Sequence, residues 1–364
     1  MSVPLRLVLS AQRCGAAAVH LARDAEALAP ALIDRRVTIP IRTGAPPPEV
    51  VTIEVPADVV VHADAFRALA DAVADGRARV FGHGDAKVVA RAAAATRTSH
   101  GPPVPLVFAH AFAFPPMRVA TLRDAVRANG ALLRACRKPT DGWTSRYLNR
   151  NVSLTLTRLL IHLGLRPNHI SLAIVAIGVA SGVVAARGTH DGFVLGAALL
   201  QVQSTLDGCD GEVARMTHRQ SRLGEWLDTI GDDLSNYAFF AGASFGMHRA
   251  TNSVAWLWVG AVIVGCGGLA SAIEYRYLAR VGSGDLLVYP IVGGPPRHPV
   301  ARVAAGLQPL FKRDTFILLT FLAAAAGALS AALIASAVGA VAILITVMRT
   351  EARLARSDTP SERR

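Results

Sequence analysis

The chain has 364 residues, 52% of them hydrophobic, and a mean hydropathy of +0.38, which is high for a soluble protein and indicates membrane spans. It carries a formal net charge of +12, nearly all of it from arginine, yet aromatic residues are only 6% and many arginines flank apolar runs, which argues against a nucleic-acid-binding module and favours a membrane protein with an anionic substrate. The four cysteines are widely scattered without a CxxC pair, which argues against a disulfide framework or a zinc site.

Residues 1–135 predict a small α/β domain, because short β-like runs alternate with Ala-rich helical runs. The expected strands lie in 6–11, 35–44, 49–62, 77–83 and 104–110, and the expected helices in 63–76 and 85–97. The domain has no Gly-rich phosphate loop, so nothing in it nominates a catalytic centre.

Residues 136–165 predict an interfacial amphipathic helix. Trp143, Tyr147 and several basic residues mix there with apolar residues at helical spacing, a pattern typical of helices that lie against a membrane. An ordinary linker helix is the alternative. A new helix is expected to begin near residue 169, with Asn168 or Ser171 as its cap.

Six apolar segments beyond residue 165 are predicted to cross the membrane, because each approaches the roughly 20 residues that a span requires. They are 169–186, 191–214, 223–247, 252–275, 314–333 and 335–349. Basic residues gather in the loops after the second and fourth segments and in a basic tail at 351–364, whereas the opposite side carries only Arg187 and Arg249. The positive-inside rule therefore predicts a multi-pass protein of the cell's inner membrane with both termini cytoplasmic.

An acidic stretch interrupts this apolar region between Leu206 and Asn236, with five aspartates and two glutamates. Asp207 and Asp210 are three residues apart, which places them on one helix face, and Asp228 and Asp232 are four apart on another. The polar segment between the pairs can turn at the cytoplasmic surface. Two antiparallel helices would then present four aspartates to each other.

Clustered carboxylates repel one another unless a cation neutralises them, and oxygen donors without His or Cys suit Mg²⁺, Mn²⁺ or Ca²⁺ rather than Zn²⁺. Gly211, Ala214 and Gly224 remove bulk beside the acids, so a phosphorylated ligand can approach the backbone. Arg215 can meet its phosphate charge. These features predict metal-dependent phosphoryl transfer in a polar cavity within the membrane.

The acidic stretch resembles the signature of the CDP-alcohol phosphotransferases, also called the CDP-alcohol phosphatidyltransferase family. Asp207-x-x-Asp210-Gly211-x-x-Ala214-Arg215, then eight residues, then Gly224-x-x-x-Asp228-x-x-x-Asp232 fills every fixed position of that signature. The resemblance covers about 140–350 and implies a mainly α fold, with a six-helix transmembrane bundle at 166–350 following the small α/β domain. It also implies an enzyme that moves a phospho-alcohol group from a CDP-alcohol to an acceptor hydroxyl and releases CMP.

The same resemblance implies a role for each signature residue. Asp207, Asp210 and Asp228 would hold a divalent metal, and Asp232 would lie near a second ion and act as the general base. The cofactors would be two Mg²⁺ or Mn²⁺ ions, and the partners would be the CDP-alcohol donor, an alcohol acceptor, the bilayer and a second copy of the chain. The positions implied to line the CDP site are Gly211, Ala214, Arg215, Asp207 and Gly224.

A second likeness concerns the flanking segments "RKPTDGWTSRYLNRNVSL" and "FKRDTF", which resemble the di-myo-inositol-phosphate-phosphate synthases. In those proteins the membrane domain is often fused to a cytidylyltransferase that makes CDP-inositol. The segment "VPADVVVHADAFRALADAV" gives residues 1–135 some similarity to a nucleotidyltransferase, in a reduced or degenerate form without its Gly-rich loop.

Several readings stay open from the residues alone. A transporter or channel that uses intramembrane carboxylates for cation passage is the alternative function. Glu212 and Glu225 occupy variable positions of the signature and are expected on the helix surface, and Asp233 is expected to be solvated or paired with an arginine. Arg313 either marks the cytoplasmic end of the fifth span or binds an acceptor's phosphate.

Overall fold

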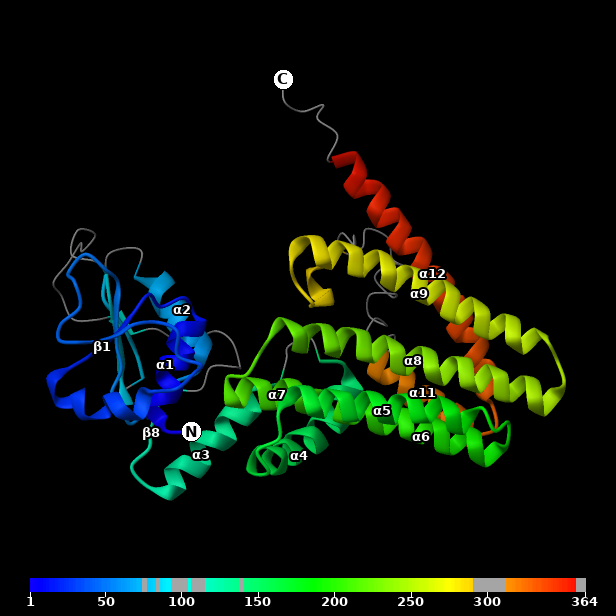
Figure 1. The fold of residues 1–364 in the computed structure, drawn as a ribbon, viewed down its shortest axis with the longest axis horizontal. Helices are drawn as coiled ribbons and strands as arrows, with labels where there is room; N and C mark the ends of the chain where they lie inside the picture. The colour runs from blue at the N-terminus through cyan, green and yellow to red at the C-terminus, as the bar shows by residue number, and fades with distance from the viewer. Residues whose placement is uncertain are drawn as a thin grey trace. The chain divides into compact units, whose positions relative to one another are not determined.

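The computed structural model describes residues 1–73, 77–82, 86–92, 104–105, 115–137, 141–290 and 312–357. The chain forms two compact units, Met1–Lys138 and the remainder, with the short stretch Arg215–His218 grouped with the first. It is mainly helical, and all described strands belong to the N-terminal unit (Figure 1), as the sequence predicted.

The N-terminal unit combines helices with short strands. Its largest sheet has the order β3-β6-β5-β7, in which β6 pairs antiparallel with β3 and β5 while β5 and β7 are parallel. β1 and β2 form a parallel pair, and β4 and β8 an antiparallel pair. The elements are α1 (Val3–Arg13), β1 (Val19–Leu21), η1 (Arg23–Leu32), β2 (Ile41–Thr43), β3 (Thr52–Glu54), β4 (Val59–Val60), α2 (Ala63–Ala72), β5 (Arg79–Phe81), β6 (Val88–Arg91), β7 (Val104–Pro105), β8 (Met117–Arg118) and α3 (Leu122–Ala135).

Two of the elements expected in this unit are wrong. Residues 6–11 form part of helix α1 instead of a strand, because the Ser2 hydroxyl caps the helix and Leu5, Val8 and Leu9 bury one helical face. Within the helix expected at 85–97, the described residues Val88–Arg91 form strand β6 instead, where burial alternates and neighbouring strands pair on both sides, and residues 93–97 lie outside the described part of the chain. The strand expected at 104–110 is described only at β7.

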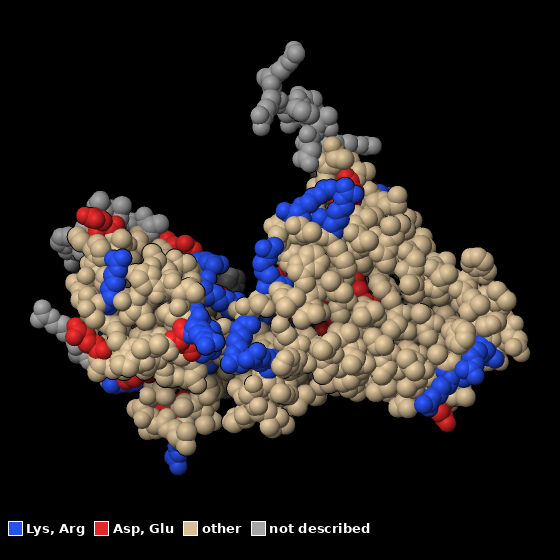
Figure 2. All heavy atoms as spheres, in the orientation of Figure 1, with Lys and Arg blue, Asp and Glu red and all other residues tan. Residues whose placement is uncertain are grey.

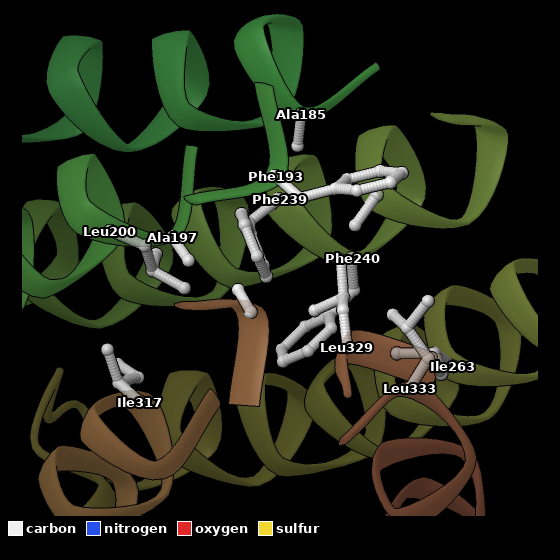
Figure 3. Close-up of a cluster of buried hydrophobic side chains, with 12 residues drawn as sticks. Ala185, Phe193, Ala197, Leu200, Phe239, Phe240, Ile263, Ile317, Leu329 and Leu333 are labelled. Carbon is white, nitrogen blue, oxygen red and sulfur yellow. The ribbon is translucent and has the colours of Figure 1, made fainter. Parts of the chain in front are cut away.

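The second unit is a helical bundle with a buried apolar core. The core joins α6, α8, α9, α11 and α12 with the end of α5, and Figure 3 shows its side chains pointing toward one another. Phe239 and Phe240 of α8 lie at its centre, with ring centroids 5.2 Å apart. The elements are η4, a π-helix (Ser145–Asn149), α4 (Arg150–His162), α5 (Pro167–Ala185), α6 (His190–Leu206), α7 (Gly208–Thr217), α8 (Arg222–Thr251), α9 (Ala255–Val281), η5 (Leu286–Val288), α11 (Arg313–Ala325) and α12 (Leu329–Ser357).

Helices α5 and α8 approach each other through small residues. A Cβ atom added at Gly182 would lie 2.1 Å from the carbonyl oxygen of Ala238, and one added at Gly178 would lie 2.1 Å from the Oγ of Ser235. Such close backbone contact is the packing mode of small residues in membrane helices. It fixes the position of α8, which carries the second half of the signature.

Three helices of the described residues, α5, α9 and α12, are long and apolar enough to cross a membrane. α6 has 17 residues and continues into α7 after a bend, α11 has 13, and α8 carries several acidic residues. The six-span count therefore stays a prediction. The break expected near residue 334 is wrong: α11 ends at Ala325, and Gly327 takes a left-handed conformation with φ of +73° before α12 begins.

Charge is distributed unevenly over the helical unit. Figure 2 shows a mostly uncharged face along the bundle, with Lys and Arg side chains gathered at its ends. The expected basic tail begins inside α12, which continues to Ser357, and residues 358–364 lie outside the described part of the chain.

Candidate functional site

The signature residues lie on three consecutive helices of the bundle. Asp207 occupies the bend at which α6 ends and α7 begins, and Asp210 follows in the first turn of α7. Gly224, Asp228 and Asp232 lie on successive turns at the start of the 30-residue helix α8.

The start of α11 brings a cation to this group of acids. The Nη1 of Arg313 donates to the carboxylate of Asp232 and lies 3.4 Å from Oδ2 of Asp207. One guanidinium therefore lies between two of the signature aspartates, which come from different helices. The interpretation of Arg313 as only a topological marker is wrong, since its side chain points into the acidic group.

Gln203, one helical turn before Asp207, completes this arrangement. Its side chain is fully buried; its Nε2 donates to Oδ1 of Asp232 over 3.3 Å, and its Oε1 accepts from Nη2 of Arg313 over 3.1 Å. The amide therefore orients both the carboxylate and the guanidinium. The sequence analysis missed it, although position 203 lies four residues before Asp207 and so on the same helix face.

The remaining two aspartates differ in exposure. Asp210 is 7% exposed and accepts a hydrogen bond from the hydroxyl of Ser171 on α5, whereas Asp228 is exposed. The carboxylate of Asp207 is close enough to those of Asp210 and Asp228 to interact with them electrostatically, and it is within hydrogen-bonding distance of Asp232. The charges of the first signature pair thus interact with those of the second across the helix boundary.

The fit of a metal ion to these residues follows from their chemistry. The donors are carboxylate oxygens with no His or Cys among them, the set that hard divalent cations prefer. Within the described ranges no three of these acidic groups already converge as a coordination shell. The donor types therefore fit Mg²⁺ or Mn²⁺, while the guanidinium of Arg313 supplies a cation between Asp207 and Asp232.

A hollow of about 350 Å³ lies beside the start of α8. Its lining residues include the N-terminal ends of α5 and α8, and they are Arg166, Pro167, Asn168, His169, Arg219 and Ser221. A Cβ atom at Gly224 would lie 3.5 Å from Oδ1 of Asn168, so a small residue keeps this region open. Two helix N-termini and two arginines make it suited to an anionic ligand.

The start of α5 differs from the expected cap. The helix begins at Pro167, the cap position is Arg166, and no side chain caps it. Asn168 is already helical and lines the hollow, and Ser171 bonds to the Pro167 carbonyl and to Asp210. Proline has no backbone N–H, so at the first helical position it removes one of the donors that a capping side chain would otherwise have to satisfy.

The other signature positions, Gly211, Ala214 and Arg215, lie on α7. Ala214 is buried and Gly211 is half-buried on α7. Arg215 follows in its last turn, and its Nε is buried without a hydrogen-bond partner among the described residues. A buried donor of this kind is suited to an acceptor oxygen of a ligand.

Three acidic residues outside the signature contradict or refine the expectations. Glu212 is fully buried, so the expectation of a surface position is wrong. Asp233 accepts hydrogen bonds from the hydroxyls of Ser271 and Tyr275 of α9, over 2.5 and 2.7 Å, which are partners that the sequence analysis did not predict. Glu225 is exposed, as expected.

Curated proteins similar to this chain share one name, bifunctional IPC transferase and DIPP synthase. The protein from Aquifex aeolicus is 33% identical over 143 residues, which cover 39% of this chain and 32% of the relative. The one from Archaeoglobus fulgidus is 34% identical over 126 residues, covering 34% of this chain and 25% of the relative. The chain thus matches a third or less of the length of these relatives.

A solved structure is also similar, the phosphatidylinositol phosphate synthase PgsA1 of Mycobacterium tuberculosis with CDP-DAG bound. The TM-score is 0.43 at 18% sequence identity, with coverage of 55% of this chain and 93% of the other. The sequence model of CDP-alcohol phosphatidyltransferases matches residues 165–348, about half of the chain and the whole of the segment that carries the signature. This protein belongs to the CDP-alcohol phosphatidyltransferase family.

Proposed function

We propose that the protein is a membrane enzyme that transfers a phospho-alcohol group from a CDP-alcohol to an acceptor hydroxyl and releases CMP. The observation that supports the proposal most directly is the guanidinium of Arg313, which contacts both Asp207 at the end of α6 and Asp232 of α8, in a chain that belongs to this family. The transporter alternative gains no support from the family assignment.

Asp232 is proposed as the general base. One of its carboxylate oxygens accepts from the Gln203 amide and the other from Arg313, so the side chain is held in one orientation. A base must be fixed within hydrogen-bond reach of the hydroxyl whose proton it takes. The surrounding contacts supply that fixation from α6 and α11.

Asp207, Asp210, Asp228 and Asp232 are proposed to hold two divalent ions, Mg²⁺ or Mn²⁺. When bound, the metal supplies charge compensation for the pyrophosphate and for the CMP leaving group. Ser171 supports this assignment, because its hydroxyl orients Asp210 from α5 in the manner of groups that position metal-binding carboxylates.

The CDP part is proposed to lie along Gly211, Ala214, Arg215 and Gly224 and to reach the hollow beside Asn168. The free donor of Arg215, the small residues and the two helix N-termini all suit a nucleotide diphosphate. The basic lining of the hollow supports the phosphate-bearing end of the donor there.

The donor and acceptor are proposed to be of the inositol-phosphate type. The likeness to the DIPP synthases supports CDP-inositol as donor, and the basic residue Arg313 beside Asp232 supports an acceptor alcohol that carries phosphate. A CDP-linked lipid as donor is the second candidate, since the same signature serves both.

A multi-pass position in the inner membrane, with the aspartates and both termini on the cytoplasmic side, is part of the proposal. The apolar helices α5, α9 and α12 and the excess of arginine on one side of the bundle support it. A homodimer is proposed from the family resemblance alone.

The test is CMP release by the purified full chain in lipid nanodiscs with Mg²⁺. CDP-inositol and CDP-diacylglycerol would be combined with inositol phosphate, glycerol phosphate and uncharged alcohols. We expect one combination to release CMP, metal chelation to stop it, and Asp232→Asn to abolish it while the melting temperature is kept. Full activity of Asp232→Asn would reject the assigned base, and ion flux through liposomes without CMP release would favour a transporter.

A further inference from the structure

Among the described acidic residues of the bundle that are not part of the signature, Glu212 is the most completely buried, with an exposed fraction of 0%. Its Oε1 accepts from Nη1 of Arg150 over 2.7 Å and from Oγ of Ser153 over 2.8 Å, and its Oε2 accepts from Oγ1 of Thr157 over 2.7 Å. All three donors come from α4. One turn of α7 is thereby bound to a second helix by three hydrogen bonds.

Arg150 extends this network to the segment before η4. Its Nε and Nη2 donate to the two carboxylate oxygens of Asp141, each over 2.9 Å, while Nη1 remains on Glu212. The side chains of Arg150 and Asp141 are only 9% and 8% exposed. A guanidinium shared in this way by two buried carboxylates has a fixed position.

Helix α4 turns three polar side chains inward, since Arg150, Ser153 and Thr157 are buried. Its exposed face is mixed, with Leu159 and Val152 beside Arg158. The buried polar stripe requires a partner inside the protein, and Glu212 is that partner.

The contacts of α4 enclose the turn that carries the first signature pair. A Cβ atom at Gly208 would lie 2.5 Å from Nη1 of Arg150, so the guanidinium packs directly on the backbone between Asp207 and Asp210. The thiol of Cys209 lies 3.6 Å from the carbonyl oxygen of Ser153, to which it donates. Helix α4 therefore contacts both residues that follow Asp207, Gly208 and Cys209.

We propose that Glu212 and Arg150 are positioning residues: they anchor the Asp207–Asp210 turn to α4, and so set the two carboxylates at the separation that a divalent ion requires. This inference rests on the proposed function through its metal assignment. If the pair served only the fold, removing the charge of Glu212 would lower the stability of the protein and leave the metal affinity of the folded protein unchanged. A positioning pair must also affect metal affinity in a folded protein.

The test compares Glu212→Gln with wild type in nanodiscs, using direct Mn²⁺ titration by electron paramagnetic resonance without substrate. The amide keeps the size of the side chain and can still meet the hydroxyls, but the charge that fixes Arg150 is lost. Glu351→Gln is the matched control. Glu351 lies on α12, which carries none of the signature aspartates, and its carboxylate accepts a hydrogen bond from the hydroxyl of Tyr289 over 3.1 Å. Loss of a group that orients a metal ligand typically weakens metal affinity by about 10- to 100-fold.

We expect Glu212→Gln to raise the Mn²⁺ concentration for half-saturation by at least tenfold, and the Mg²⁺ requirement of CMP release in parallel, with Glu351→Gln unchanged. Thr157→Val, which removes one hydroxyl donor to Glu212 but keeps the carboxylate that fixes Arg150, replaces Glu212→Gln if that variant fails to fold, with a smaller shift in the same direction. Unchanged Mn²⁺ affinity in the folded variants would overturn the proposal, as would a wild-type protein that binds no Mn²⁺. Mn²⁺ binding without CMP release from any donor would reject the proposed function and leave the positioning test intact.

Discussion

The buried amide of Gln203 allows a sharp test of how the proposed base is held. Gln203→Leu keeps the volume and burial of the side chain but removes the donor to Asp232 and the acceptor for Arg313. Each hydrogen bond to a charged group contributes about 1.5–3 kcal/mol. Asp232 and Arg313 remain partners of each other in this variant. We therefore expect the transition state to lose the stabilisation of one hydrogen bond to a charged group, which corresponds to a roughly 10- to 100-fold lower kcat.

The assay is steady-state CMP release at saturating Mg²⁺, with melting temperature measured on the same preparations. Gln201→Leu is the matched control. Gln201 lies on the same helix, and among the described residues its amide nitrogen makes two long contacts of 3.4 Å, to Asn149 and Thr205. We expect kcat to fall in the Gln203 variant with little change in the KM of the donor, and Gln201→Leu to retain most of its activity. Equal losses in both variants, or an unchanged kcat for Gln203→Leu, would refute the assigned role.

Two further predictions concern packing and pH. Gly182→Ala should lower the melting temperature, because the added Cβ forces α5 away from α8 at a cost of about 1–3 kcal/mol for overpacking. The control is Gly268→Ala on α9, where an added Cβ meets nothing within 4 Å, and this variant should be neutral or stabilising. Equal melting temperatures of the two variants would contradict the close contact between α5 and α8. Hydrogen bonds from Thr121 hold the pKa of Asp124 below its ordinary value of 3.8, so its stabilisation of α3 is complete above that pH and is lost as pH falls. Hydrogen–deuterium exchange of Leu122–Ala135 should be faster in Asp124→Asn at neutral pH, and this difference from wild type should shrink below pH 3.8; a difference independent of pH would contradict the assignment.

Helical spacing alone predicted that Asp228 and Asp232 lie on one face of a single helix, because a regular helix leaves little freedom in which residues are neighbours. Asp207 lies between α6 and α7, so the arrangement of all four aspartates around a metal stays a prediction. The mainly α class and the strands confined to the N-terminal unit also followed from hydropathy and periodicity.

Partners from distant segments were not predictable in the same way. Gln203 and Arg313 meet only because α6 and α11 pack together, and nothing in the local sequence of either fixes that contact. The burial of Glu212 was not predictable either, because its partners Arg150, Ser153 and Thr157 alternate with other polar residues along α4, and only the packing of α4 shows which of them face inward.

Local pattern also failed where two structures suit the same residues. The run at 6–11 is apolar and short enough for a strand, and only the Ser2 cap and the packing of the helix decide for α1. Near residue 327 the apolar pattern is continuous, so the break depends on one glycine that can take a positive φ.

Four acidic residues of the bundle show two ways in which the charge of a carboxylate is compensated. Glu212 receives three hydrogen bonds, including one from Arg150, and Asp233 receives two hydroxyls from α9, so each has partners of its own. Asp207 and Asp232 instead share the single guanidinium of Arg313, with further carboxylates within electrostatic range. Buried charges persist only when they are compensated. Among the described residues, the guanidinium of Arg313 carries one positive charge and contacts two signature carboxylates, so we expect added divalent cations to bind there.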